Sequence, residues 1–315
     1  MLKNLARKLP GIRKLSAERA ALIQERDDLL HRIDWMKRKQ GEVPAGHFYS
    51  PVPDFDDLRA NAPSSLNPVD FELAAVDLNE REQLELLDDL SRFYLQMPFE
   101  ATRKEGLLYY FENPAFSYAD AILLHCMIRH HRPKRIIEVG SGFSSCMMLD
   151  TNELFFGGEI DLTFIEPYPD LLTSLVKTGK QESINLIQSP LQEVDLRVFE
   201  SLSANDILFI DSTHVSKFGS DVNQLFFKIL PRLNPGVLIH FHDIIYPFEY
   251  PPHWILKGRA WNEAYVLRAF LQYNNAYRIA LMNTYLLQQH RTFFEQKMPL
   301  CLQNTGGGIW LKKQI

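Results

Sequence analysis

The sequence predicts an α/β fold built on a mostly parallel sheet. From Pro133 onward, short apolar runs typical of buried strands alternate with longer helix-like segments. Alternation at this spacing is typical of βαβ units, in which helices cover both faces of a parallel sheet. The residues before Pro133 are mainly helical in pattern. We therefore expect one central sheet with a helical N-terminal extension.

Composition and charge limit the class of protein. The chain has 315 residues, 46% of them hydrophobic and 23% charged, which suffices for one large domain and an accessory one. Its net charge of −5 gives no indication of a general nucleic-acid binder. The charge is uneven, because residues 1–40 carry +6 and the remainder carries −11. A basic arm therefore precedes an acidic body.

The cysteines and the hydropathy pattern predict a cytoplasmic protein. The three cysteines are widely spaced and form no CxxC pair, which indicates reduced thiols; they are Cys126, Cys146 and Cys301. No apolar run approaches the roughly 20 residues that span a bilayer. The N-terminus lacks the apolar core of a signal peptide. We expect no membrane span.

The first segment, residues 1–45, is predicted to be a basic helical extension. Residues 15–39 contain no Gly or Pro and form one expected helix. Four apolar residues recur every seven positions, Leu15, Leu22, Leu29 and Met36. Only Ile33 matches the second apolar position of a heptad, so the coiled-coil pattern is incomplete. Two interpretations stay open: the helix packs on its own body, or it forms a homodimer contact.

The middle segment, residues 46–116, is predicted to be a linker followed by a helical cap. Gly and Pro mark residues 41–58 as a linker or ordered loop, and residues 68–105 look helical and acidic. The third segment, 117–315, begins with a helix for which Ser117 is the expected N-cap.

The third segment contains the alternating pattern. Strands are expected at 135–140, 161–167, 184–188, 206–211 and 236–243, and helices at 144–155, 170–180, 191–202 and 219–232. A further helix is expected at 260–273. The last two strands, 276–283 and 306–313, can form an antiparallel pair.

A glycine turn follows the first strand. In "IIEVGSGFSS", Gly140 and Gly142 let the backbone turn tightly before a helix N-terminus that offers free N–H groups. The dinucleotide fingerprint needs a third glycine, where this chain has Ser145. Glu138 precedes the turn, and Glu166 ends the second strand, where a carboxylate can bind ribose hydroxyls.

At these residues the chain resembles the class I S-adenosylmethionine-dependent methyltransferases. The acidic-x-Gly-x-Gly motif is present as Glu138-Val-Gly140-Ser-Gly142, although Ser144 replaces the usual third glycine. The resemblance covers residues 117–315. It implies a Rossmann-like, mostly parallel sheet of seven strands with a terminal antiparallel pair.

The resemblance also implies S-adenosylmethionine as the cofactor. The turn from Gly140 to Ser144 would hold its methionine part, Glu166 its ribose, and Pro167 and Tyr168 would flank its adenine. The expected cofactor-binding residues are Glu138, Gly140, Ser141, Gly142, Ser144, Glu166, Pro167, Tyr168 and Asp211.

Histidines and aspartates follow the fourth and fifth strands. Open α/β sheets bind ligands beyond the carboxyl ends of their strands. In the strand order expected for this fold, strands one, four and five are neighbours. We therefore expect Asp211, His214, His242 and Asp243 to converge beside the glycine turn.

This second pattern resembles the metal-dependent O-methyltransferases of the catechol and macrocin types. Asp211 matches their aspartate on strand four, while their acidic pair after strand five is here His242-Asp243. The resemblance implies a divalent metal at Asp211, His242 and Asp243. A histidine ligand favours Mn, Fe or Zn over Mg. Alternatively, no metal binds and the histidines handle the proton directly.

The predicted catalytic residues are His214, His242 and Asp211. His214 stands where catechol-type enzymes have a lysine base, and we expect neighbouring carboxylates to bring its pKa toward neutral. His240 is expected to make a hydrogen bond inside the sheet. Residues 246–254, rich in Pro and Tyr, are expected to form a non-helical aromatic loop over the site, or else a plain surface loop.

We predict an enzyme that methylates a hydroxyl of a small molecule or sugar. A second hypothesis is a non-catalytic methyltransferase-like protein that binds partners through its N-terminal helix. A nicotinamide-dependent oxidoreductase is disfavoured, because the GSGFSS turn departs from the dinucleotide fingerprint.

Overall fold

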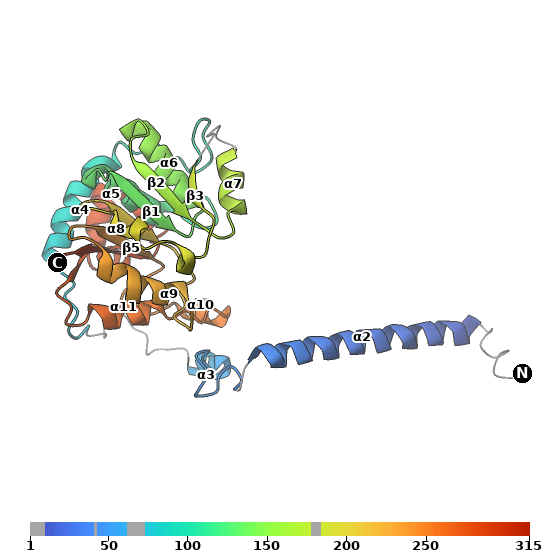
Figure 1. The fold of residues 1–315 in the computed structure, drawn as a ribbon. Helices are drawn as coiled ribbons and strands as arrows, with labels where there is room; N and C mark the ends of the chain where they lie inside the picture. Colours follow the sequence, from blue (N-terminus) through green and yellow to red (C-terminus); the bar gives the residue numbers. More distant parts are fainter. Residues whose placement is uncertain (1–9, 41–42, 62–72, 178–183) are drawn as a thin grey trace, which may run out of the picture. The chain divides into compact units, whose positions relative to one another are not determined.

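The computed structural model describes residues 10–40, 43–61, 73–177 and 184–315. The chain forms two compact units, Met1–Ser64 and Ser65–Ile315. Each unit is described by itself (Figure 1).

The first unit contains a long helix, α2 (Pro10–Gln40), and a short one, α3 (Phe55–Asn61). Helix α2 extends further than the segment expected from the sequence, because Pro10 occupies its first position, where a missing N–H is no loss. The described side chains of α2 are exposed, apart from Asp27, which is half-buried.

The second unit is built on one seven-stranded sheet of order β3-β2-β1-β4-β5-β7-β6. The strands are β1 (Arg135–Val139), β2 (Asp161–Ile165), β3 (Asn185–Ile187), β4 (Ile207–Ile210), β5 (Leu238–His242), β6 (Tyr277–Met282) and β7 (Gly308–Lys313). β7 pairs antiparallel with both β5 and β6, while the other pairs are parallel. The predicted Rossmann-like sheet with its terminal antiparallel pair is confirmed.

Helices cover both faces of this sheet. In Figure 1, α5 (Tyr118–His131) and α6 (Phe143–Phe156) lie on the opposite side of the sheet from α9 (Asp221–Gln224) and α11 (Glu263–Leu271). Strands β4 and β5 are buried along their whole length, since their apolar runs pack on both faces. Helix α7 (Asp170–Lys177) follows β2, and η2 (Leu191–Glu193) and α8 (Arg197–Glu200) follow β3.

The helix expected over 68–105 is much shorter. Only α4 (Glu80–Tyr94) is helical among the described residues of that stretch, and irregular turns follow it. The Asp150 carboxylate, on α6, accepts hydrogen bonds from the backbone N–H groups of Leu108 at 2.9 Å and Tyr109 at 2.8 Å. The Asp150 side chain thus accepts the hydrogen bonds that backbone carbonyl groups would accept if these buried residues were helical.

Two other expectations are corrected. The helix predicted at 219–232 is divided into α9, a π-helical turn η3 (Leu225–Ile229) and a 3₁₀ turn η4 (Leu230–Arg232), because Pro231 cannot continue the α-helical bonding. The loop predicted to be non-helical contains α10 (Pro252–Leu256), since proline is tolerated at the first helical position.

Helices also join the last two strands. Between β6 and β7 lie α12 (Asn283–Gln289), α13 (Arg291–Lys297) and η5 (Pro299–Leu302), none of which the sequence analysis anticipated. Among the helices that the structure describes, none is both long and apolar enough to cross a membrane.

Candidate active site

The turn after β1 needs glycine for a steric reason. Gly140 has a φ of +81°, and a Cβ at this position would lie 1.8 Å from the backbone oxygen of Asp211. The turn therefore touches the end of β4 directly, and any side chain would push the two apart. Helix α6 begins after Gly142, whose N–H donates to the Ser145 hydroxyl at 3.0 Å.

Glu138 supports this turn from inside the protein. The Ser144 hydroxyl donates to its carboxyl group at 2.5 Å, and the Ser145 hydroxyl donates to its other oxygen. Burial raises the pKa of Glu138 to about 8, against the lowering effect of these hydrogen bonds. Because both oxygens are engaged and the residue is fully buried, Glu138 holds the shape of the turn.

Glu166 connects the ends of β1 and β2. One carboxylate oxygen accepts from the N–H of Ser141 at 3.2 Å, and the other accepts from the N–H of Tyr168 at 2.8 Å. Glu166 is half-buried, whereas Tyr168 is 83% exposed. The carboxylate is therefore fixed at the sheet edge with lone pairs left for a ligand.

A cavity of about 370 Å³ lies at this edge of the sheet. Its lining includes five of the predicted cofactor-binding residues, Gly140, Glu166, Pro167, Tyr168 and Asp211. The loops after β3 and β4 supply lining residues that the sequence analysis missed, among them Leu191, Gln192, Thr213, Lys217 and Asp221. The predicted residues Glu138, Ser141, Gly142 and Ser144 are in the adjoining strand and turn. The volume is in the range of small-molecule sites.

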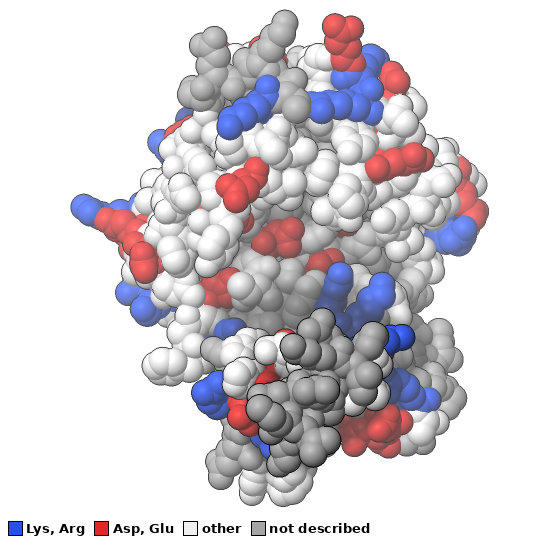
Figure 2. Space-filling view, turned by 90° about the vertical axis from the view of Figure 1, so that its right-hand side faces the viewer, with Lys and Arg blue, Asp and Glu red and all other residues white. Residues whose placement is uncertain are grey.

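Acidic side chains lie in a hollow of the molecular surface (Figure 2). Figure 2 shows a hollow near the centre of the face, with acidic side chains inside it. Glu166, Asp211 and Asp221 all line the cavity. Lys217 also lines the cavity, so three carboxylates face one ammonium group and the net charge of the lining favours a cationic ligand.

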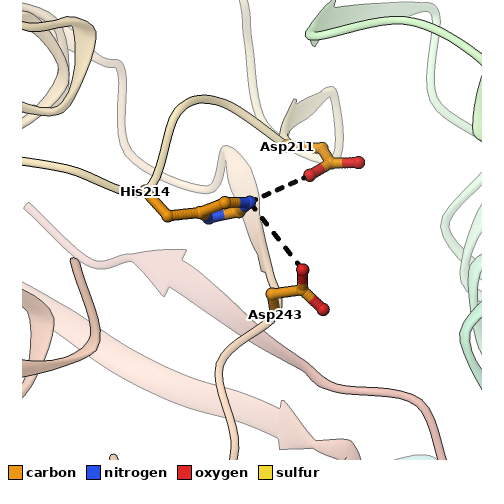
Figure 3. Close-up of side chains that lie close together, drawn as sticks. All are labelled: Asp211, His214 and Asp243. Atoms are coloured by element: carbon orange, nitrogen blue, oxygen red, sulfur yellow. Dashed lines mark ion pairs between the residues drawn. The ribbon is translucent and has the colours of Figure 1, made fainter. Parts of the chain in front are cut away.

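Next to the cavity, three side chains converge from the loops after β4 and β5. His214 Nε2 lies 3.3 Å from an Asp211 carboxylate oxygen and 3.8 Å from an Asp243 oxygen (Figure 3). Their ligand-type atoms all lie within 4.8 Å of one another. We call these three residues the acidic-histidine cluster. His214 and Asp243 both have left-handed backbones, with φ of +57° and +56°.

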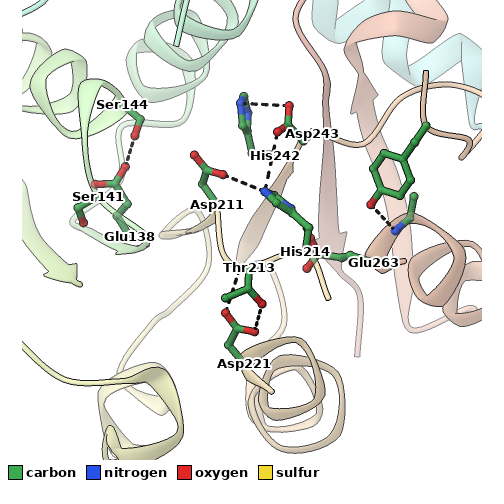
Figure 4. A network of polar contacts seen from close by, with 12 residues as sticks. Glu138, Ser141, Ser144, Asp211, Thr213, His214, Asp221, His242, Asp243 and Glu263 are labelled. Carbon is green, nitrogen blue, oxygen red and sulfur yellow. Dashed lines mark hydrogen bonds and ion pairs between the residues drawn. The ribbon is translucent and has the colours of Figure 1, made fainter. Parts of the chain in front are cut away.

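A fourth residue, Glu263, fixes the orientation of His214. The Glu263 carboxylate lies 2.8 Å from His214 Nδ1, so Nε2 faces the two aspartates (Figure 4). The N–H groups of Asn262 and Glu263 also donate to the His214 carbonyl, at 3.0 and 3.1 Å. Glu263 is the first residue of α11 and fully buried. The sequence analysis missed it, because one acidic residue at a helix start is unremarkable.

The pKa of His214 differs from our expectation. Burial alone would lower it, but hydrogen bonds to Asp211 and Glu263 and their charges outweigh burial and raise the pKa to about 10. The expectation of a nearly neutral pKa was therefore wrong. Two carboxylates near the imidazole, with Asp243 close by, favour a proton or a metal cation at Nε2.

His242 lies beside the cluster but is buried. Its Nε2 is 3.7 Å from an Asp243 oxygen, and its ring contacts Phe116 with centroids 5.3 Å apart. Its Nδ1 has no hydrogen-bond partner among the described residues. The cluster of potential metal ligands thus contains His214 at the place where the sequence analysis put His242.

His240 makes no hydrogen bond among the described residues, contrary to our expectation. Its ring stacks on Phe209 at 4.4 Å and lies 4.7 Å from Trp310. These neighbours on β4 and β7 present rings rather than acceptors, and burial lowers the pKa of His240 well below its ordinary value. The residue packs as a neutral aromatic ring.

Aromatic side chains stand over one side of the cluster. The Trp261 ring lies 4.3 Å from the His214 ring, and Tyr250 lies 5.8 Å from Trp261. The Arg259 guanidinium packs over Trp254 at 4.7 Å and over Trp261 at 4.6 Å. The ring on His214 is thus Trp261, which lies outside the aromatic loop predicted at 246–254; that loop contacts Trp261 through Tyr250 and Trp254.

Comparisons with known proteins agree with this geometry. A family model described as a methyltransferase domain matches residues 137–244. A protein of Archaeoglobus fulgidus, described only as uncharacterized, is 35% identical over 185 residues, which cover 57% of this chain and 82% of that protein.

Solved structures of methyltransferases show weaker similarity. The O-methyltransferase TomG from Streptomyces achromogenes, in complex with SAM, is 14% identical with a TM-score of 0.41, covering 73% of this chain and 90% of that one. SAH-bound PaMTH1 from Podospora anserina is 14% identical with a TM-score of 0.40, covering 62% and 78%.

The sheet order defines the class of protein by its fold, the Rossmann-like class I methyltransferase fold, and residues 137–244 within it match the methyltransferase-domain model. The chain belongs to the same family as the A. fulgidus protein, and its methyltransferase domain includes residues 137–244. The matched range contains the glycine turn and the acidic-histidine cluster, but not Glu263.

Proposed function

We propose that this protein transfers the methyl group of S-adenosylmethionine to a hydroxyl of a small molecule or sugar. The main observation behind the proposal is that Asp211 belongs to two neighbouring sites. It lines the cavity beside the glycine turn and also belongs to the acidic-histidine cluster. A cofactor in the cavity and an acceptor at the cluster would therefore meet at Asp211.

On the cofactor side, Glu166 is the ribose ligand. Its carboxylate is already fixed by two backbone N–H groups and needs no reordering to accept bonds from ribose hydroxyls. Pro167 and Tyr168 flank the adenine, and the turn from Gly140 to Ser144 receives the methionine part. The three carboxylates of the lining outnumber its one cation, Lys217, which suits the positive sulfonium.

On the acceptor side, the acidic-histidine cluster positions the hydroxyl and receives its proton. The bound cofactor supplies an electrophilic methyl group, so the protein's task is alignment and proton removal. Asp211 and Asp243 accept hydrogen bonds from the hydroxyl and take up its proton, while the cationic His214, held by Glu263, offsets their negative charge. Trp261 and Tyr250 offer an apolar wall for a ring or sugar face.

The cluster also fits a divalent cation. Two carboxylates and an imidazole nitrogen form a mixed oxygen and nitrogen donor set, which suits Mn, Fe or Zn better than Mg. Glu263 on the far nitrogen of His214 is the arrangement typical of metal-bound histidines. Asp211, His214 and Asp243 would hold the ion, with His242 adjacent. A bound ion would polarise the hydroxyl and ease its deprotonation.

Isothermal titration with S-adenosylmethionine tests the cofactor part. Glu166→Ala should weaken binding by about 10–100-fold, because charge-assisted bonds to the ribose are lost. Glu159→Ala, at an exposed position, is the matched control and should bind normally. A wild-type protein that binds no cofactor would overturn the proposal and favour the non-catalytic hypothesis.

Manganese titration, followed by the electron paramagnetic resonance signal of free Mn²⁺, tests the metal part. Wild type should bind one ion, and Asp243→Asn should lose most of the affinity, whereas the exposed control Asp161→Asn should not. If wild type binds no ion while it still forms S-adenosylhomocysteine from a hydroxyl acceptor, only the direct proton-handling route remains.

A further inference from the structure

Helix α2 presents a row of apolar side chains to solvent. Leu15, Leu22, Leu29 and Met36 are 66%, 65%, 49% and 60% exposed. Most helical stability in proteins comes from packing of such a row against a partner, and isolated helices are marginal in water. We therefore expect another apolar surface to pack against this row of side chains.

The structure completes the heptad pattern of this helix. Because α2 begins at Pro10, Ile12 joins the same stripe as Ile33. The stripe then reads Ile12, Leu15, Arg19, Leu22, Arg26, Leu29, Ile33 and Met36, with alternating steps of three and four residues. This is the a/d spacing of a coiled coil, with Leu or Met at d and Ile or Arg at a.

Charges beside the stripe compensate the two arginines. Glu18 and Glu25 directly precede Arg19 and Arg26, which places each glutamate at the g position next to an a arginine. In a parallel two-stranded coil, g of one helix borders a of the other. Each arginine would therefore meet a glutamate of the partner. In the single helix Arg26 forms an exposed ion pair with Asp27. Because exposed ion pairs contribute little to stability, Arg26 can leave Asp27 for a glutamate of the partner helix.

We propose that α2 pairs with α2 of a second copy of this chain, in a parallel and in-register two-stranded coiled coil. Ile at a with Leu at d favours two strands. A shift by one heptad would set Ile12 against Arg19 of the partner. An antiparallel pair would set both arginines against leucines. In the parallel, in-register pair Arg19 and Arg26 each face their own copy, and only this pairing gives both of them a flanking glutamate of the partner helix.

A membrane surface fits the helix less well. Interfacial helices combine an unbroken apolar face with a basic polar face. Here Arg19 and Arg26 interrupt the apolar row, and Asp27, Asp28 and Asp34 lie on the remaining surface. Membrane binding is therefore an outcome to be tested against the proposal.

The mass of the full chain in solution tests the pairing. Light scattering should give twice 36.6 kDa for wild type. The double variant Leu22→Asp, Leu29→Asp should have the mass of a monomer, and the melting temperature of its second unit, Ser65–Ile315, should be unchanged. The matched control, Gln24→Asp with His31→Asp, adds the same charges at the outer f positions and should stay dimeric. A wild-type monomer, or dimers in both double variants, would overturn the proposal.

A single cysteine tests the orientation. The native cysteines are all buried, so Leu15→Cys near the helix start supplies the accessible thiol. Oxidation should give a covalent dimer in a parallel pair, whereas Ala17→Cys at an f position should cross-link poorly. A dimer that resists cross-linking at Leu15→Cys would refute the parallel arrangement.

Charge reversal tests the register. Glu18→Lys with Glu25→Lys should weaken the dimer at least about tenfold, since each arginine then meets a like charge. Adding Arg19→Glu and Arg26→Glu should restore part of the affinity. Weakening without any rescue would contradict the pairing of arginine with glutamate. Sedimentation of a monomeric wild type with anionic phospholipid vesicles would assign the stripe to a membrane instead.

Discussion

At the scale of single residues, His214 owes its properties to groups that are distant in the sequence. Glu263 holds one ring nitrogen at 2.8 Å, and Asp211 faces the other at 3.3 Å. Burial disfavours the charged imidazole, yet these carboxylates favour it more strongly. A cation at Nε2, whether a proton or a metal ion, is therefore the natural state of the cluster.

Glu263 should act through His214 rather than on the substrate. Glu263→Gln keeps an acceptor for His214 Nδ1 but removes the charge, so Mn²⁺ affinity should fall by about 10–100-fold. Glu249→Gln is the control, because Glu249 accepts a hydrogen bond from the Tyr265 hydroxyl on α11 and does not contact His214. A loss of thermal stability with unchanged Mn²⁺ affinity would instead give Glu263 a purely structural role.

Glu138 should make stability depend on pH. Its pKa is raised from an ordinary 4.5 to about 8 by burial, with a further contribution from the charge of Asp211. The folded state therefore binds this proton more tightly than the unfolded state. The proton on Glu138 therefore stabilises the folded state. This contribution is complete when the pH is below the pKa of Glu138 in the unfolded chain, and it is lost as the pH rises through the folded-state pKa of about 8.

The side chain of the variant Glu138→Gln cannot ionise, so the variant should not lose stability in this way as the pH rises. Melting temperatures measured without cofactor or metal, from about pH 5 to about pH 9, should shift in favour of the variant as pH rises. The difference between variant and wild type isolates Glu138, because all other groups titrate in both proteins. A constant difference across this range would show that Glu138 ionises normally.

At the scale of elements, the turn between β1 and α6 is fixed by its approach to β4. Gly140→Ala would place a methyl group 1.8 Å from the Asp211 carbonyl oxygen. Gly106 has nearly the same φ, +85°, with no atom within 4 Å of an added Cβ. Both substitutions add similar backbone strain, so the comparison isolates the collision.

We expect Gly140→Ala to lose S-adenosylmethionine binding and to melt well below Gly106→Ala. The first variant must separate the glycine turn from the end of β4, which displaces both the cavity wall and Asp211. Calorimetric titration and thermal unfolding of the two variants check this. Equal behaviour of the two proteins would mean that the turn tolerates movement and does not position the site.

At the scale of the whole molecule, the sheet and its site belong to the second unit. The glycine turn, the cavity and the acidic-histidine cluster all lie within Ser65–Ile315. Deletion of residues 1–64 should therefore leave a folded protein with unchanged S-adenosylmethionine affinity and a similar melting temperature. Circular dichroism and calorimetric titration of the truncated chain check this. Failure to fold would show that the first unit contributes to the core of the second.

The sequence by itself determined the sheet and several residues that line the cavity at its edge. Buried parallel strands are short apolar runs, and their order along the chain follows from alternation with helices. The glycine turn was visible because only glycine suits a close backbone approach, here Gly140 against Asp211. Glu166 was visible because it ends the second strand. These signals are local, so a single sequence carries them.

Only the tertiary structure decided which groups meet at the cluster. Glu263 follows His214 by 49 positions, and no local pattern marks the contact. Both His214 and His242 lie near Asp243, but only His214 also groups with Asp211, and this depends on side-chain direction, to which the left-handed backbones at His214 and Asp243 contribute. The pKa of His214 likewise depends on burial and on charges brought together by folding. Electrostatics acts through space, so these properties become defined when the loops after β4 and β5 pack against α11.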